Sequence, residues 1–252
     1  MTDVASCPVT VSVVSHGQGE MVATLLHDLD RCAAVRQVLL TQNIPEPEID
    51  CPESLRPRLV VVRNGRPKGF AANHNQAFRR CETPFFAVVN PDIQLGQDPF
   101  PRLIETVMEG NCGLAAPAVR NPEGAIEDSA RYFPTPFRLL AKLLKLGDGR
   151  HVVVGDAPVA VDWTAGMFLV FCTETFRDLG GFDEGFFLYY EDVDICVRLW
   201  RAGRRVMFHP GVLVIHAAQR ASRRQLRYMA WHLSSMARYF TKHLGRLPRT
   251  CT

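Results

Sequence analysis

The sequence predicts an α/β fold in which a mostly parallel sheet is flanked by helices. Short apolar runs rich in β-branched residues alternate with helical patterns, as in sheets whose parallel strands are joined by helices. The run at 85–89 is apolar throughout, as expected for a central strand that is buried on both faces. With 252 residues, 47% of them hydrophobic, the chain can form one large domain with a helical tail.

The first half of the chain carries the regular part of this pattern. We expect strands at 9–14, 35–40, 59–63 and 85–89, a helix that ends at Leu29 and another helix at 70–80. The segment NIPEPEIDCPESLRPR at 43–58 contains four prolines, so we expect a surface loop without regular structure there.

The second half is less regular. Residues 113–136 predict a strand, a turn and a second strand, and a short helix follows through Leu146. Later elements are an apolar strand at 167–172, a helix that ends at Gly203, and two strands at 206–209 and 212–216.

Composition and charge restrict the class of protein. A formal net charge of +3 is too small to indicate nucleic-acid binding, and we expect no nucleic-acid partner. Eight cysteines are scattered singly without a CxxC pair, as in a reduced, cytoplasmic protein with free thiols. No stretch approaches the roughly 18 apolar residues of a membrane span, and the amino terminus lacks the pattern of a signal peptide.

The segment GGFDEGFFLYYEDVDICVR at 180–198 combines acidic and aromatic side chains. Carboxylates among aromatic rings lose solvation, which raises their pKa values and suits a general base. Glu191 and Asp192 abut the aromatic run and begin a helix, so they are the candidates for that role. For Asp194 we expect a surface pair with Arg198 one turn later, worth only about 0.3 to 1 kcal/mol.

Polar residues also follow the buried strand at 85–89. Asn90, Pro91 and Asp92 come directly after it, and open α/β sheets bind ligands at the carboxyl ends of their strands. The alternative is that this tripeptide simply makes a turn.

Five blocks in this order carry a resemblance: NGRPKGFAANHNQAF, VVNPDIQL, VDWTAGMFLV, GGFDEGFFLYYEDVDICVRLWRAG and VLVIHAAQRAS. The chain resembles inverting family 2 glycosyltransferases of the GT-A fold, especially the bacterial rhamnosyltransferase branch, over roughly positions 8 to 245. This resemblance implies the GT-A fold for 1–219, followed by a basic amphipathic helical segment at 220–252.

The resemblance implies a divalent cation, Mg²⁺ or Mn²⁺, on the diphosphate of a sugar nucleotide. The family's Asp-any-Asp motif matches Asn90 to Asp92, where this chain keeps only the second acid. One carboxylate can hold a hard cation together with phosphate oxygens and water, which makes Asp92 a metal ligand. His216 matches a position that supplies an additional ligand in related enzymes, and the alternative is an ordinary surface histidine.

The resemblance also assigns the catalytic roles. Asp192 is the expected base that takes a proton from the acceptor hydroxyl, and Glu191 orients the acceptor or tunes the pKa of Asp192. Asp183 and Glu184 are expected near the acceptor, although they equally suit a polar turn.

The donor and the sugar are expected to contact two further sets of residues. The donor nucleotide is implied to lie at His16, Gly17, Asn43, Lys68, Gly69, Phe70, His74, Asn75 and Asn90. A glycine such as Gly69 allows close backbone approach, whereas Lys68 either reaches a phosphate or stays in solvent. The sugar and acceptor pocket is implied to include Asp162, Trp163 and Gly166, where an indole face covers apolar sugar surface unless it is simply a core residue.

The final segment, 217–247, has the pattern of an amphipathic helix. Leu226, Met229, Leu233, Met236 and 239–240 form one apolar stripe, which we expect to pack on the sheet. A basic cluster begins this segment, and it either lies on an anionic membrane or is simply solvated; its members are Arg220, Arg223, Arg224 and Arg227.

The function expected from the resemblance is transfer of rhamnose from dTDP-rhamnose to a saccharide acceptor. The acceptor can be lipid-linked, and the setting is cell-surface polysaccharide assembly at the inner face of the membrane. Two alternatives stay open. One is the same fold with a UDP-hexose or galactofuranose donor, and the other is a noncatalytic adaptor at the membrane, which the incomplete Asn90 to Asp92 motif favours.

Overall fold

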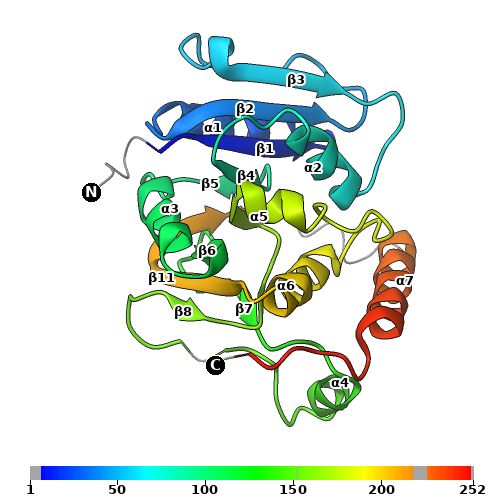
Figure 1. Ribbon diagram of the computed structural model, residues 1–252. Coiled ribbons are helices and arrows are strands. Elements are labelled where there is room, and N and C mark those ends of the chain that lie inside the picture. Colours follow the sequence, from blue (N-terminus) through cyan, green and yellow to red (C-terminus); the bar gives the residue numbers. More distant parts are fainter. Residues whose placement is uncertain (1–6, 152, 218–225, 251–252) are drawn as a thin grey trace.

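A mixed sheet of nine strands lies between two layers of helices in the computed structural model, which describes residues 7–151, 153–217 and 226–250 (Figure 1). The strand order is β3-β2-β1-β4-β10-β6-β11-β5, and β8 pairs with β11. The strands of this sheet are β1 (Val9–Ser15), β2 (Val35–Gln42), β3 (Leu59–Arg63), β4 (Phe85–Val89), β5 (Ile93–Gln94), β6 (Cys112–Arg120), β8 (Val159–Ala160), β10 (Phe168–Cys172) and β11 (Arg205–His216).

A second, small sheet and the helices complete the fold. The small sheet pairs β7 (Ala130–Arg131) with β9 (Trp163–Thr164). The helices are α1 (Gly19–Asp30), α2 (Phe70–Phe78), α3 (Phe100–Met108), α4 (Pro136–Leu143), α5 (Thr173–Asp178), α6 (Glu191–Arg201) and α7 (Leu226–His243). Strands β1 to β4 are parallel, which confirms the expected α/β architecture, while β10 runs antiparallel to both β4 and β6.

The two faces of the sheet bury separate apolar cores. Along β4, Phe85, Ala87 and Val89 face the core that α1 and α3 cover, whereas Phe86 and Val88 face the core under α2, α5 and α6. This alternation follows from the two-residue period of a strand. Because both faces are covered, β4 is apolar at every position, as the sequence predicted.

Several expected boundaries differ from the structure. The proline-rich loop contains a short 3-10 helix at Arg56–Arg58, where Pro57 sits in the first turn and its missing N–H is not needed. The strands expected at 206–209 and 212–216 form one strand, β11, whose register shifts between His209 and Leu213. Pro210 lies in that shift, because proline cannot donate to the neighbouring strand.

The antiparallel course of β10 creates the edge at which polar residues gather. Because Phe168 pairs with Val89, the start of β10 lies beside the end of β4. The backbone N–H of Asn90 donates to the carbonyl of Met167 at 2.9 Å, which joins the segment after β4 to the segment before β10. Polar groups from separate parts of the chain therefore meet at one edge of the sheet.

The expected apolar stripe of α7 is wrong in part. Ser235, Tyr239 and His243 form the buried face, while Leu226 is 83% exposed and Met229 and Leu233 are more than half exposed. The surface under α7 offers polar partners: Ser235 Oγ donates to the carbonyl of Leu188 at 2.8 Å, and His243 contacts a buried carboxylate. Polar partners therefore decide which face is buried.

The basic cluster expected before α7 lies mostly outside the described residues, which include its last member, Arg227, but not Arg220, Arg223 or Arg224. None of the described helices is long and apolar enough to cross a membrane.

Candidate active site

A strained backbone places the first residues of α6 at a cavity. Tyr189 and Tyr190 have φ angles of 71° and 68°, in the left-handed region that residues other than glycine rarely adopt. Each such residue costs about 1 to 3 kcal/mol, and such strain concentrates at functional sites. The turn carries Glu191 and Asp192 to the cavity wall.

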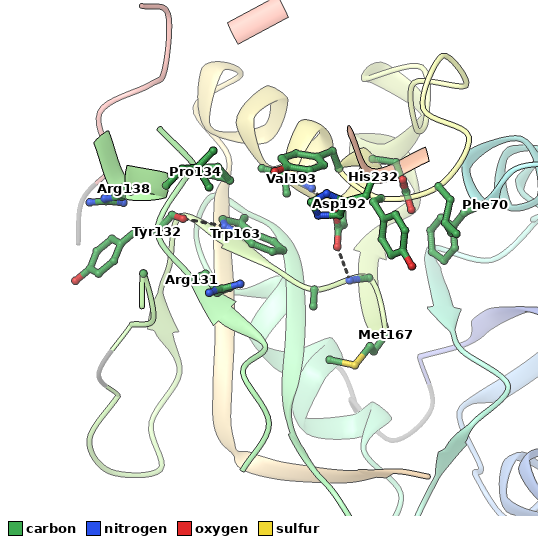
Figure 2. A pocket seen from close by; sticks show the side chains of 18 of the residues that line it. Phe70, Arg131, Tyr132, Pro134, Arg138, Trp163, Met167, Asp192, Val193 and His232 are labelled. Atoms are coloured by element: carbon green, nitrogen blue, oxygen red, sulfur yellow. Dashed lines mark hydrogen bonds between the residues drawn. The ribbon is translucent and has the colours of Figure 1, made fainter. Parts of the chain in front are cut away.

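The carboxylate of Asp192 is held by two backbone donors. The N–H of Gly166 donates to Oδ2 at 2.9 Å, and the N–H of Val193 donates to Oδ1 at 2.8 Å (Figure 2). Burial raises the pKa of Asp192, although these two hydrogen bonds oppose the rise. Asp192 therefore combines a fixed orientation with a proton affinity above the ordinary range.

Glu191 lies beside Asp192 and is buried, with an exposed fraction of 4%. Burial, followed by the negative charge of Asp192, raises the pKa of Glu191 well above its usual range. Its Oε2 atom has no hydrogen-bond partner among the described residues. Asp192, whose two oxygens each accept a backbone hydrogen bond, is therefore better placed than Glu191 to carry a negative charge.

The cavity has a volume of about 410 Å³, which suits a small organic ligand. Aromatic side chains line it, and the ring N–H of Trp163 donates to the carbonyl of Tyr132 at 2.9 Å (Figure 2). The other aromatic lining residues are Phe70, Tyr189 and Tyr190. Aromatic faces of this kind cover the apolar C–H surface of sugars.

Cations line the same cavity, and the sequence reasoning missed them. Arg131 comes from β7, and Arg138 and Lys142 come from α4. The guanidinium of Arg138 lies 4.2 Å from the centre of the Tyr132 ring. In the sequence, the only signal was the four-residue spacing of Arg138 and Lys142 on one short helix. Such a spacing does not by itself indicate a cavity.

Asp92 and His216 meet at the carboxyl end of β4. Nε2 of His216 lies 3.1 Å from Oδ2 of Asp92, and Nδ1 lies 2.8 Å from Oε2 of Glu127, a residue that the sequence analysis did not single out. Burial alone would lower the pKa of His216, but Asp92 and Glu127 outweigh it and raise the pKa to about 8. The expected proximity of Asp92 and His216 is thus present in the structure.

The residues at this edge offer few ligands to a divalent cation. Among the described residues, no group of three or more His, Cys, Asp and Glu side chains is arranged to hold a metal ion. Oδ1 of Asp92 is buried without a hydrogen-bond partner in that part of the chain, which leaves one oxygen for a cation. Such a cation can take its other ligands from phosphates and water, so Asp92 fits as a single protein ligand. Both nitrogens of His216 already contact carboxylates, so its metal role stays a prediction.

The expected nucleotide residues at the ends of β1 and β2 lie together. Asn43 Nδ2 donates to the carbonyl of Lys68 at 2.9 Å, and Asn43 Oδ1 accepts from the N–H of Lys68 at 2.8 Å. Asn43 also contacts Nδ1 of His16 at 3.2 Å, and the following Gly17 has a φ of 86°. The side-chain amide of Asn43 forms its hydrogen bonds within the protein, so it fixes the position of two loops. The Lys68 ammonium donates to Gln76.

Gly69 and Asn75 tie α2 to the loop before α6. A Cβ atom on Gly69 would lie only 2.3 Å from the carbonyl oxygen of Phe187, so this glycine is required by a close approach within the protein itself. Asn75 donates to the carbonyl of Phe182 at 2.8 Å and accepts from its N–H at 2.9 Å. Of the expected donor residues on α2, Phe70 lines the cavity.

Other expected site residues lie away from the cavity lining. Asp162 is buried and accepts hydrogen bonds from the N–H of Phe133 and from Thr250. Asp183 pairs with two cations of α7, and Glu184 accepts from Asn75 at 3.0 Å. His74 is buried in the core at 2.8 Å from Ser12 Oγ, and burial lowers its pKa to about 3. Trp163, Gly166 and Asn90 do line the cavity, while their contacts with donor and sugar stay predictions.

Comparisons with known proteins identify the family. The profile of Glycosyl transferase family 2 matches residues 47–160. Rhamnosyltransferase WbbL of Escherichia coli (strain K12) is 26% identical over 254 residues, which cover 93% of this chain and 93% of that protein. The chain is a glycosyltransferase that is similar to family 2. An N-acetylglucosaminyl-diphospho-decaprenol L-rhamnosyltransferase of Mycobacterium tuberculosis (strain CDC 1551 / Oshkosh) is 30% identical over 148 residues, covering 51% of this glycosyltransferase and 45% of the relative.

Solved structures show that this glycosyltransferase has the GT-A fold. The crystal structure of GalNAc-T7 with UDP, GalNAc and Mn²⁺ gives a TM-score of 0.65 at 16% identity, covering 84% of this chain and 43% of that chain. The mannosyltransferase PcManGT from Pyrobaculum calidifontis, in complex with GDP-Man and Mn²⁺, gives 0.62 at 17% identity, covering 93% and 63%. The family and fold that the five sequence blocks suggested are therefore confirmed.

Proposed function

We propose that this glycosyltransferase transfers rhamnose from dTDP-rhamnose, with inversion, to a saccharide or lipid-linked saccharide. Its setting would be cell-surface polysaccharide assembly at the cytoplasmic face of the membrane. The observation that carries the proposal is the Asp192 carboxylate, which lines an aromatic cavity and is aimed by Gly166 and Val193. The rhamnosyltransferase names of the two relatives support the choice of sugar.

In the proposed mechanism Asp192 acts as the general base. Its carboxylate takes the proton of the acceptor hydroxyl while that oxygen attacks the anomeric carbon from the side opposite the nucleotide, and the bond to the diphosphate breaks. Glu191 lies next to this base, and its burial and the charge of Asp192 raise the pKa of Glu191 well above its usual range. Trp163 and Tyr190 enclose apolar sugar surface, to which a 6-deoxy sugar adds a methyl group.

Asp92 would hold a divalent cation through Oδ1. When bound, the cation would neutralise charge on the leaving diphosphate. Lys68 and other cationic side chains would add their positive charge. Both Mg²⁺ and Mn²⁺ accept oxygen ligands of this kind, so the residues do not favour one over the other. The Mn²⁺ in the two solved glycosyltransferase structures supports a divalent cation as the cofactor.

The raised pKa of the carboxyl pair predicts an acid limb in the pH profile. Asp192 must be deprotonated to act as a base, so kcat/KM should fall as the pH falls through a pKa above the ordinary value of an aspartate, about 3.9. The measurement is kcat/KM between pH 4 and 9, with the fold followed by circular dichroism. Absence of an acid limb within this range would contradict the assignment.

Calorimetric binding of dTDP, UDP and GDP tests the donor without knowledge of the acceptor. We expect dTDP to bind most tightly in the presence of Mg²⁺ or Mn²⁺ and to weaken in chelator, because Asp92 supplies a free oxygen next to phosphate ligands. Asp92→Ala should bind dTDP equally with and without metal. A preference for UDP would replace the rhamnosyl proposal by transfer from a UDP-sugar, and binding of none of the three would overturn a nucleotide-sugar donor.

A further inference from the structure

Helix α4 presents its apolar face to solvent. Phe137 and Leu143 are 78% and 79% exposed, and Leu140 and Leu144 are more than half exposed. None of the residues of α4 is buried. Residues 137, 140 and 144 lie on one face because helix neighbours recur at three and four residues. An amphipathic helix normally turns this face toward the core, so α4 has the reverse orientation.

Cationic side chains of α4 lie beside its apolar face, on the side of the helix nearest the cavity. Arg138 and Lys142 lie one turn apart and line the active-site cavity. Lys145 and Arg150 follow in the same segment. Arg150 pairs with Asp128 and Asp148, and Arg138 lies 3.6 Å from Asp162, whereas Lys142 and Lys145 form no ion pair among the described residues. The apolar face of α4 is therefore bordered by positive charge on the side nearest the cavity.

A second exposed apolar stripe lies on α7. Leu226, Met229 and Leu233 recur at three and four residues and are 83%, 57% and 53% exposed. His232, also on α7, lines the same cavity as Lys142, and the proximity of Lys142 contributes to lowering the pKa of His232, after the larger effect of burial. Exposed apolar side chains thus occur on α4 and α7, two of the helices that contribute residues to this cavity.

We propose that α4 docks this glycosyltransferase on an anionic lipid membrane. Phe137, Leu140, Leu143 and Leu144 would enter the boundary between headgroups and acyl chains, a depth of about 5 to 10 Å for helices of this kind. The neighbouring cations select lipid over a second copy of this chain, because anionic headgroups attract them whereas an identical cationic surface repels them. The cavity would then open next to the membrane surface.

This inference goes beyond the proposed function, because it assigns a membrane contact to α4 and not to the basic cluster at 220–227. It holds for any donor and any acceptor. A test without substrates therefore separates its failure from a failure of the rhamnosyl proposal.

Vesicle co-sedimentation of the whole chain is the test. Vesicles of phosphatidylcholine with phosphatidylglycerol should bind the protein, and vesicles of phosphatidylcholine alone should bind it more weakly. Leu143→Ser/Leu144→Ser should weaken binding to the anionic vesicles at least about tenfold, since two apolar side chains are removed from the lipid contact. Both positions are exposed, so the thermal melting curve should stay unchanged.

Met108→Ser is the matched control. Met108 is 47% exposed at the end of α3, away from the active-site cavity, and its substitution should leave vesicle binding unchanged. Equal loss in the control and the α4 variant would overturn the proposal, as would absence of binding to anionic vesicles. Sedimentation velocity supplies a further check: a wild-type dimer that Leu143→Ser/Leu144→Ser dissociates would show that a second copy covers α4 and would also overturn it.

Discussion

Replacing Asp192 by asparagine is expected to lower kcat for glycosyl transfer at least about a hundredfold, the usual contribution of a positioned general base. The amide has nearly the same shape as the carboxylate but cannot accept the proton of the acceptor hydroxyl. Donor affinity should change little, because the bonds of Asp192 go to the backbone of Gly166 and Val193. The measurements are kcat and the calorimetric affinity for the nucleotide.

Two further variants make this result specific. Glu191→Gln should lower kcat less than Asp192→Asn, since it removes a neighbour of the base and not the base. Glu174→Gln is the control, because Glu174 also lies in the first turn of a helix, α5, but is exposed and outside the cavity lining. Near-normal turnover of Asp192→Asn with a large loss in Glu191→Gln would transfer the role of base to Glu191.

The sequence could predict the features that depend on period and on strand ends. The apolar run of β4, the polar residues after it and the acidic first turn of α6 were all recognised in this way. Asp92 and His216 also come together as expected. These features follow from local patterns and from the rule that ligand sites lie at carboxyl ends of strands.

Features that depend on tertiary packing could not be predicted. Two consecutive tyrosines, Tyr189 and Tyr190, do not predict a left-handed backbone, because the surrounding structure imposes that conformation. The apolar pattern of α4 indicates a buried face, yet that face is exposed. Gly69 shows a related limit: the close approach that it permits is to Phe187, which lies far away in the sequence.

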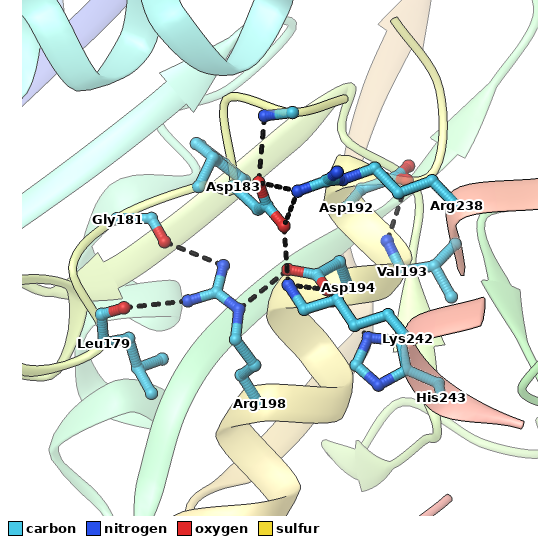
Figure 3. A network of polar contacts seen from close by, with 12 residues as sticks. Leu179, Gly181, Asp183, Asp192, Val193, Asp194, Arg198, Arg238, Lys242 and His243 are labelled. Carbon is cyan, nitrogen blue, oxygen red and sulfur yellow. Dashed lines mark hydrogen bonds and ion pairs between the residues drawn. The ribbon is translucent and has the colours of Figure 1, made fainter. Parts of the chain in front are cut away.

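Asp194 pairs with Arg198 as expected, but the expectation that this pair lies at the surface is wrong. Asp194 is completely buried and lies at the centre of a charged network between α6 and α7 (Figure 3). Arg198 Nε lies 2.7 Å from its Oδ2, and His243 Nε2 and Lys242 Nζ lie 2.7 and 2.6 Å from its Oδ1. Arg198 also donates to the carbonyls of Leu179 and Gly181. The network therefore anchors α7 beside the helix that carries the base.

Burial alone would raise the pKa of Asp194, but the hydrogen bond from His243 and the charge of Arg198 outweigh it and hold the pKa below its usual range. Because the pKa is lower in the folded protein than in the unfolded chain, this carboxylate stabilises the fold above the ordinary aspartate pKa. Its contribution is lost as the pH falls below that value.

Asp194→Ala is accordingly expected to lower the free energy of unfolding by about 3 to 5 kcal/mol at neutral pH, because it leaves buried cationic partners without a counter-charge. Chemical denaturation measures this loss, and hydrogen exchange should show the earliest opening in α7. Asp50→Ala is the control, since Asp50 pairs with His27 at the surface and should cost about 1 kcal/mol or less. The difference between wild type and Asp194→Ala should shrink in acid, where Asp194 gains a proton. Equal losses in the two variants, or a difference independent of pH, would contradict a stabilising role of the buried charge.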